Sequence, residues 1–232
     1  SSTTLIGGLI MIHGDDDGII LPPKIASAHV VLMPIFRKSG DRADVMTYID
    51  NLAQRRREIS YHDRKIVVEI DARDIGGARG WDWIKKGIPL RVEIGPRDIE
   101  QNSVYVGRRD KAHNEKKSIK KEQFIAELTT ILDEIQGNLF ARAETFRKDH
   151  TVALNDKQAF WDFFTPQNSQ KPEIHGGFAV SHWCGEDACE ARIKEDLAAT
   201  IRCLPFEQEK VSGVCISCGK PAINRAIFAK AY

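Results

Sequence analysis

Four cysteines form two close pairs near the end of this 232-residue chain. Cys184 and Cys189 are separated by four residues, Cys215 and Cys218 by two, and 25 residues lie between the pairs. A short turn of this kind directs two sulfur atoms to one point, and zinc prefers four such ligands in a tetrahedron about 2.3 Å from the metal. The spacing therefore predicts a zinc site. Because four thiolates leave no position for a water molecule, its role would be structural.

Two disulfides or free thiols are the alternatives to a metal at these cysteines. The chain has five cysteines, all after residue 183. An odd number confined to one end favours a metal site in a reducing compartment over a disulfide framework. The fifth, Cys203, lies in an apolar segment, and we interpret it as a small buried hydrophobic side chain. His182 lies beside the first pair, but four cysteines already complete a zinc shell.

The basic segment 107–121 is a second group of residues that could bind a ligand. It contains seven Lys or Arg residues and two acids. Such a segment fits contact with nucleic-acid phosphates, which would be sensitive to salt. A solvated loop is the alternative, and the residues alone leave both interpretations open.

The composition is that of a soluble globular protein, with 42% hydrophobic and 29% charged residues. Lys plus Arg total 34 and Asp plus Glu 33, so the net charge of +1 does not indicate a nucleic-acid partner. Any such signal must be local. The sequence contains no run of about 18 apolar residues, so we expect no membrane span. The first residues lack the basic leader of a secretory signal and resemble the interior of a longer chain.

Strands alternate with helices over residues 27–135, which predicts an α/β domain. Strands are expected at 29–36, 65–70, 89–94 and 103–106, a helix at 41–60 and a short helical turn at 81–86. A long helix is expected at 120–148 because apolar residues recur there at helical spacing. These residues are Phe124, Leu128, Ile131, Ile135, Leu139 and Phe146.

The remaining residues predict a second, smaller unit around the cysteine pairs. Helices are expected at 158–164 and 190–200, and strands at 177–183, 201–206 and 222–232. The predicted fold class is therefore α/β, with a mixed-sheet domain followed by a small α/β zinc-binding domain.

Three segments resemble conserved parts of prolyl-tRNA synthetases. Residues 6–24 (IGGLIMIHGDDDGIILPPK) resemble the third conserved motif of the class II catalytic domain. Residues 83–98 (WIKKGIPLRVEIGPRD) resemble the signature of the anticodon-binding domain. The cysteine pairs, the segment ATIRCLPF and the terminal Tyr232 resemble the C-terminal extension of the archaeal and eukaryotic-type enzymes. The three signatures follow the family's order and cover essentially the whole chain.

The resemblance implies three domains and a function for the complete protein. The domains would be the end of the catalytic domain at 1–26, an anticodon-binding domain with a long connecting helix at 27–150, and a zinc-binding domain at 151–232. The complete enzyme would use ATP and Mg²⁺ to attach proline to tRNA(Pro), as a cytoplasmic homodimer joined through its catalytic domain. The present part, which lacks the other two class II motifs, would bind the anticodon stem-loop and be inactive alone.

The resemblance also implies which residues bind RNA. Arg91 matches the family's anticodon-reading arginine, and Arg97 and Asp98 match its turn of Gly-Pro-basic-Asp. Trp81 could offer a face on which a base stacks. Arg108 and Arg109 of the basic segment would contact phosphates.

Several positions depart from the family pattern. Ser2 matches a hydroxyl near ATP, but Thr4 stands where the family has an arginine that holds the ATP phosphates. Gly80 and Ile84 stand in place of an aromatic residue and a glutamate of the anticodon site. These departures favour the alternative of a paralogue or tRNA-binding module without full aminoacylation activity. A zinc-stabilised interaction domain without a tRNA role is a third hypothesis.

Overall fold

The computed structural model describes residues 3–38, 40–57, 59–168, 170, 175–208 and 211–230, with only the backbone of 56 and 57. The chain divides into two compact units, Ser1–Ala143 and Glu144–Tyr232. Each contains helices and a sheet of mixed strand direction, which confirms the predicted α/β fold class.

Some expectations are not tested by this fold. The division into domains at 1–26, 27–150 and 151–232 stays a prediction. The predicted ATP contact at Ser2 and the terminal Tyr232 lie outside the described residues.

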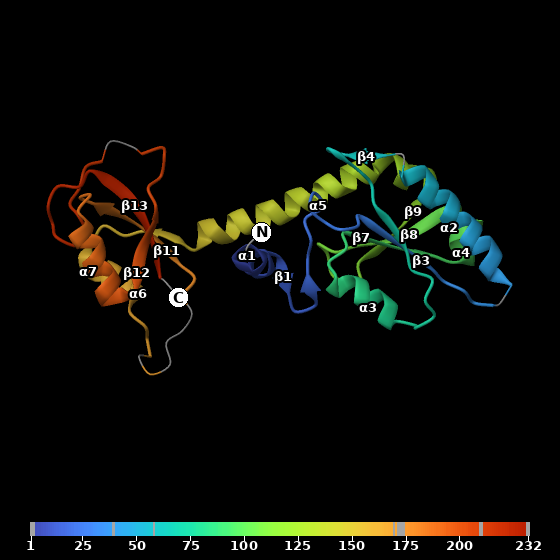
Figure 1. The fold of residues 1–232 in the computed structure, drawn as a ribbon, viewed down its shortest axis with the longest axis horizontal. Helices are drawn as coiled ribbons and strands as arrows, with labels where there is room; N and C mark the ends of the chain where they lie inside the picture. The colour runs from blue at the N-terminus through green and yellow to red at the C-terminus, as the bar shows by residue number, and fades with distance from the viewer. Residues whose placement is uncertain are drawn as a thin grey trace. The chain divides into compact units, whose positions relative to one another are not determined.

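The first unit is built on a five-stranded sheet in the order β6-β3-β7-β8-β9 (Figure 1). The strands are β3 Val30–Pro34, β6 Val68–Ile70, β7 Leu90–Ile94, β8 Ser103–Arg108 and β9 Lys116–Lys120. β3 is parallel to β6 and β7, whereas β7, β8 and β9 are antiparallel. Parallel neighbours need crossover connections, and α2 Asp41–Arg57 and α3 Ala78–Lys85 supply them.

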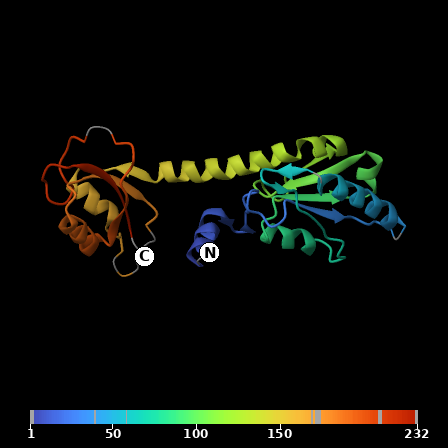
Figure 2. The ribbon, with the colours of Figure 1, turned by 45° about the horizontal axis from the view of Figure 1, so that its top comes forward.

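Helices cover both faces of this sheet because both faces are apolar. Alternate side chains of a strand point to opposite faces. In β3, Val30 and Leu32 join the main core with α2 and α5 Lys121–Asp149, while Val31 and Met33 join a smaller core beside α3. Figures 1 and 2 show α5 and α3 on opposite sides of the sheet.

The predicted long helix is present as α5, and its apolar face is buried as far as Leu139. The prediction that Phe146 extends this face is wrong. Phe146 is 60% exposed and stacks on His150 with ring centroids 4.0 Å apart. The core of the first unit contains no α5 residue beyond Leu139, so nothing there covers the later positions.

Residues 3–19 form a helix and a hairpin that the sequence did not predict. α1 spans Thr3–His13, and β1 Gly14–Asp15 pairs with β2 Gly18–Ile19. The described residues of α1 include no buried one. Five of its apolar side chains are each more than half exposed: Leu5, Ile6, Ile10, Met11 and Ile12. This apolar surface calls for a cover that the described residues do not supply.

A small hairpin, β4 Ser60–Tyr61 and β5 Arg64–Lys65, leads into β6 beside a buried histidine. His29 is fully buried, and the N–H of Val67 donates to its Nδ1 at 2.9 Å. The Arg64 guanidinium lies 3.2 Å from the other ring nitrogen. Burial, and after it the charge of Arg64, lowers the pKa of His29 to about 4. The ring is therefore neutral at pH 7.

We expect the first unit to lose stability as the pH falls from 6.5 towards 4. The pKa of His29 is about 4 in the folded protein and close to the ordinary 6.5 in the unfolded chain, so the unfolded state binds more protons in this window. The slope per group is at most about 1.4 kcal/mol per pH unit. Urea denaturation of wild type and His29→Gln at pH 7 and pH 4.5 measures it. An equal acid effect in both proteins would contradict the assignment.

The second unit is a four-stranded sheet in the order β10-β11-β13-β12 with two helices. The strands are β10 Thr151–Ala153, β11 Phe178–Trp183, β12 Ala199–Cys203 and β13 Asn224–Lys230, and the helices are α6 Lys157–Phe164 and α7 Asp187–Leu197. β10 is parallel to β11, and the other pairs are antiparallel. Three fully buried phenylalanines, Phe160, Phe164 and Phe228, pack edge to face in its core.

One sequence expectation fails in this unit. Cys203 is exposed, not buried. It ends β12 beside a register shift in the pairing with β13, where the strand leaves the core. Throughout the described residues, the longest apolar stretches of helix fall short of what a membrane crossing requires.

Candidate nucleic-acid interface and metal centre

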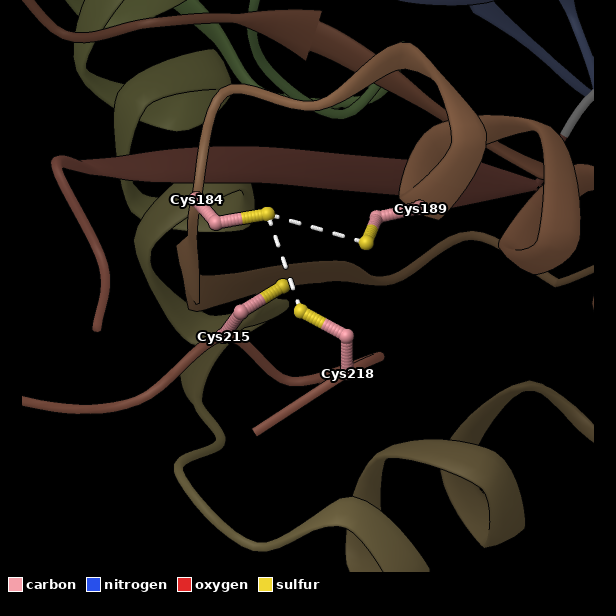
Figure 3. Close-up of side chains that lie close together, drawn as sticks. All are labelled: Cys184, Cys189, Cys215 and Cys218. Atoms are coloured by element: carbon pink, nitrogen blue, oxygen red, sulfur yellow. Dashed lines mark hydrogen bonds between the residues drawn. The ribbon is translucent and has the colours of Figure 1, made fainter. Parts of the chain in front are cut away.

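Four cysteine sulfur atoms meet in the second unit (Figure 3). The Sγ atoms of Cys184, Cys189, Cys215 and Cys218 all lie within 4.8 Å of one another. The Cys184 sulfur is 3.6 Å from that of Cys189 and 3.8 Å from that of Cys218. A tetrahedron with metal–sulfur bonds of about 2.3 Å has edges of about 3.8 Å. The cluster therefore fits one zinc-sized ion, and no disulfide joins its members.

Two turns from distant parts of the sequence bring these sulfurs together. Cys184 directly follows β11, and Cys189 lies in the first turn of α7. The turn that carries Cys215 and Cys218 is attached to the end of β11, because the N–H of Ile216 donates to the carbonyl of His182 at 2.9 Å. The imidazole of His182 does not belong to the cluster.

The backbone around Cys215 favours the thiolate form of its side chain. Burial opposes ionisation of Cys215, but the N–H groups of Cys218, Ser217 and Cys184 outweigh it and lower the pKa of Cys215 to about 7. Because metal ligation requires the deprotonated sulfur, this arrangement suits a cation.

A cavity lies on the sheet face that carries α3. Leu90, Val92 and Ile94 of β7 fill the main core, so Arg91 and Glu93 point to the opposite face. There they line a cavity of about 270 Å³. Trp81 and Ile84 of α3, together with His113 and Lys116 beside and at the start of β9, complete much of its wall.

Arg91 is a buried cation with an unused donor. Arg91 is only 3% exposed. Its Nη1 has no hydrogen-bond partner among the described residues. Burial and then the nearby Arg109 lower the pKa of Arg91, while Glu93 opposes that shift. An arginine nevertheless stays charged in proteins. A buried donor left without a partner indicates a place where a ligand supplies the acceptor.

Room for Arg91 comes from its neighbour across the sheet. Gly107 on β8 pairs with Arg91. A Cβ built on Gly107 would lie 3.2 Å from Arg91 Nη2. The absence of a side chain there lets the guanidinium lie flat against β8.

Two aromatic rings and a structural arginine shape the cavity. Trp81 is 40% exposed and packs against His113, with centroids 5.0 Å apart. Trp83 instead packs on the small core and donates to Asp71 Oδ2 at 2.6 Å. Arg79 donates to backbone carbonyls, including that of Pro34 at 2.7 Å, and so holds α3 against the sheet.

A second cavity of about 270 Å³ shares Glu93 with the first. Arg97 and Asp98, in α4 Pro96–Glu100, line it together with Arg37 and Tyr105. Arg97 is exposed. The carboxylate of Asp98 accepts a hydrogen bond from the N–H of Gly95 at 2.9 Å and thus caps α4. The base contacts predicted for Arg97 and Asp98 stay predictions.

Arg108 and Arg109 are both held by carboxylates. Arg108 pairs with Asp110 at 2.9 Å and with Glu134 at 2.6 Å. Arg109 is 4% exposed and contacts both oxygens of Asp15, at 2.5 and 2.8 Å, which fixes the N-terminal hairpin to the sheet. The basic segment comprises the end of β8, the connecting residues 109–115, all of β9 and the first residue of α5. Exposed lysines of β9, such as Lys117, are better placed than these two arginines to meet a phosphate.

The positions that depart from the family pattern fall in two places. Thr4 is exposed on α1. Gly80 and Ile84 lie on α3 and line the cavity of Arg91, where Ile84 is 6% exposed.

Four further residues of these two cavities were not predicted: Glu93, His113, Tyr105 and Arg37. Glu93 could have been found from the alternation of strand 89–94, which places it on the same face as Arg91. The other three come from separate strands and loops, and no pattern along the sequence connects them.

We expect Gly107→Ala to weaken ligand binding in the first cavity while preserving the fold. The new Cβ would press on the guanidinium of Arg91, which is the movable end of a long side chain. Displacing one charge-assisted hydrogen bond is worth about 1.5–3 kcal/mol. Gly137→Ala is the matched control, because a Cβ on Gly137 meets nothing within 4 Å. Binding titrations with an RNA stem-loop and thermal melts of both variants test this. Equal binding by both variants would contradict it.

Two protein-family models match the chain. The model described as "Anticodon binding domain" matches residues 29–131, which contain the sheet and both cavities. The model described as "Prolyl-tRNA synthetase, C-terminal" matches residues 169–232, which contain the cysteine cluster.

The chain is also similar over its whole length to curated proteins. It is 46% identical to a proline–tRNA ligase of Protochlamydia amoebophila, 43% identical to proline–tRNA ligase 2 of Anaeromyxobacter dehalogenans and 41% identical to a proline–tRNA ligase of Bdellovibrio bacteriovorus. Each match covers 100% of this chain and 46% of the relative. The chain thus spans about half the length of these relatives.

Proposed function

Since the chain belongs to the prolyl-tRNA synthetase family, we propose that it is the C-terminal part of a proline–tRNA ligase and binds the anticodon stem-loop of tRNA(Pro). The observation that carries this proposal is the cavity on β7, in which a buried guanidinium has an unused donor. Bases of a single-stranded loop offer acceptors on their edges and faces for stacking. Arg91 and Trp81 supply the corresponding donor and ring.

The complete enzyme would join proline to tRNA(Pro) with ATP and Mg²⁺, as a homodimer formed through its catalytic domain. The exposed apolar side chains of α1 support the presence of such a catalytic domain in the complete enzyme. They need a cover, and the relatives are about twice as long as this chain. We assign α1 to the edge of the catalytic domain, with Thr4 and Ser2 near the ATP site. The part described here would not catalyse aminoacylation alone.

We propose zinc as the metal of the cysteine cluster, where it would hold the two turns of the second unit together. Four thiolates are soft ligands that select zinc over magnesium or calcium. The site would be structural, because its four ligands are all protein sulfurs. Free thiols of this kind persist in a reducing compartment, which is consistent with a cytoplasmic enzyme.

A tRNA-binding module without full aminoacylation activity is the second candidate function. Thr4 favours it, because threonine cannot offer the bidentate cationic fork with which arginine holds phosphates. Proline-dependent ATP–pyrophosphate exchange by the full-length protein distinguishes the two. Exchange supports the ligase, and its absence supports the module.

Equilibrium binding of a labelled anticodon stem-loop tests the common part of both candidates. We expect the chain to bind the stem-loop of tRNA(Pro) more tightly than one carrying an unrelated anticodon. We also expect affinity to fall with added salt, because backbone phosphates contribute. Equal affinity for both stem-loops would contradict the proposal of anticodon recognition.

A further inference from the structure

Arg109 is a buried cation that contacts both the N-terminal hairpin and the wall of the first cavity. It is 4% exposed. Its Nη1 and Nη2 donate to the two carboxylate oxygens of Asp15 at 2.8 and 2.5 Å, and its Nε donates to the carbonyl of Ile84 at 3.0 Å. The side chain of Ile84 lines the cavity that contains Arg91. One guanidinium therefore joins the hairpin to a residue of the cavity wall.

Close packing holds the hairpin against the end of α3. A Cβ built on Gly18 of β2 would lie 2.7 Å from the Cα of Lys85. A Cβ built on Gly87, just after α3, would lie 2.5 Å from the carbonyl oxygen of Ile19. The N–H of Leu21 also donates to the carbonyl of Gly87 at 3.1 Å. Since packed atoms transmit displacement, a shift of α3 would move the hairpin with it.

The hairpin continues directly into α1 at its other end. His13 ends the helix and Gly14 begins β1. A Cβ built on Gly14 would lie 2.6 Å from the carbonyl oxygen of Ile10, so this joint is also tight. α1 carries Thr4, at the position that the resemblance assigns to the ATP phosphates. The contacts of Arg109 thus connect the cavity on β7 with the helix of the proposed ATP site.

We propose that Arg109 is a positioning residue that couples the first cavity to the ATP site of the complete enzyme. A base in the cavity would fix Ile84 and α3. Arg109 would transmit this constraint to Asp15, and the hairpin would hold α1 in the arrangement that binds nucleotide. Each ligand would then spare the other part of the cost of ordering these elements, so the coupling is positive.

This inference rests on the proposed function, because it takes the anticodon loop and an adenylate as the two ligands. It adds a connection between their sites and the residue that makes it. Coupling between two binding equilibria is reciprocal. An adenylate in the ATP site must therefore strengthen binding of the anticodon loop by the same factor as the loop strengthens binding of the adenylate.

Equilibrium binding of the tRNA(Pro) anticodon stem-loop to the full-length protein tests this coupling. The titration would be made without and with a saturating, non-hydrolysable prolyl-adenylate analogue. We expect the analogue to tighten stem-loop binding by wild type about fivefold or more, the lower end of typical couplings. In Asp15→Asn, which keeps the shape but loses the charge that holds Arg109, the two affinities should become equal. Arg109→Lys should behave in the same way, because lysine lacks the fork that contacts Asp15 and Ile84 together.

Asp16→Asn is the matched control for Asp15→Asn. Asp16 is the exposed neighbour of Asp15 in the hairpin, whereas the ion pair of Arg109 is with Asp15. We expect Asp16→Asn to keep the effect of the analogue. Asp15→Asn should also keep the wild-type affinity for the stem-loop when the analogue is absent, because Arg91 and Trp81 are unchanged. Thermal melts check that each variant is folded.

The outcomes separate this inference from the proposed function. If wild type shows no preference for the tRNA(Pro) stem-loop over an unrelated one, the proposed function fails. If it shows that preference but the analogue does not bind, or binds without changing stem-loop affinity, only the coupling is wrong. A wild-type effect of the analogue in either Asp15→Asn or Arg109→Lys would mean that Arg109 only stabilises the fold. An equal loss in Asp16→Asn would also overturn the assignment.

Discussion

Removal of the proposed zinc ion is expected to unfold residues 144–232 while the first unit stays folded. The core of the second unit is small, and zinc contributes about 10–16 kcal/mol to the folding of small zinc domains. The first unit has its own larger core and no residue in the cysteine cluster. Hydrogen exchange of the whole chain before and after chelation measures this. Protection should be lost in β11 and α7 and retained in β3 and β7.

A serine substitution gives the same test without a chelator. Cys215→Ser should release the metal and remove protection in the second unit, because Cys215 is a buried member of the cluster. Cys203→Ser is the matched control, since Cys203 is exposed and lies outside the cluster. Unchanged metal content and exchange in Cys215→Ser, or an equal effect of both substitutions, would exclude a structural metal.

Replacing Arg91 by methionine is expected to weaken stem-loop binding roughly 10- to 100-fold, the worth of one bidentate contact to guanine. The same change should leave the free protein as stable as before, or more stable. A buried donor without a partner costs about 1–3 kcal/mol, and Arg91 Nη1 is such a donor. A residue that only stabilises the fold would show the opposite pattern: its replacement would lower the stability of the protein and leave stem-loop binding unchanged.

Arg79 is the matched control for Arg91. Both arginines line the same cavity and both are buried. The guanidinium of Arg79, however, donates to the carbonyls of Asp71, Arg73 and Pro34. We therefore expect Arg79→Met to lower the free energy of unfolding. Urea denaturation and stem-loop titration of both variants test the contrast. A loss of stability in Arg91→Met as large as in Arg79→Met would mean that Arg91 stabilises the fold.

Much of this fold could be predicted because its elements carry local patterns. The apolar repeat of α5 from Phe124 to Leu139 meets a real core. The buried strand β3 is a continuous apolar run, and β7 alternates apolar with charged residues. The cysteine spacing predicted the cluster, since two short turns constrain where their sulfurs point. Phe146 and Cys203 were misjudged because a local apolar pattern does not show where an element leaves its core. Phe146 lies beyond the last core residue of α5, and Cys203 lies at the end of β12.

The rest depends on contacts that a linear pattern does not contain. Arg108 and Arg109 look like phosphate ligands in the sequence, and only the fold brings Asp15 and Glu134 to them. Glu93 lines the site because β7 places it between two cavities whose other walls come from five further segments. α1 could not be foreseen from amphipathicity, because its apolar residues point in all directions.

Nuclease footprinting of full-length tRNA(Pro) shows whether the cavity on β7 receives the anticodon. We expect the chain to protect nucleotides of the anticodon loop, and Arg91→Met to lose this protection at the same RNA and protein concentrations. Protection confined to other parts of the tRNA, or equal protection by Arg91→Met, would show that the cavity on β7 does not receive the anticodon.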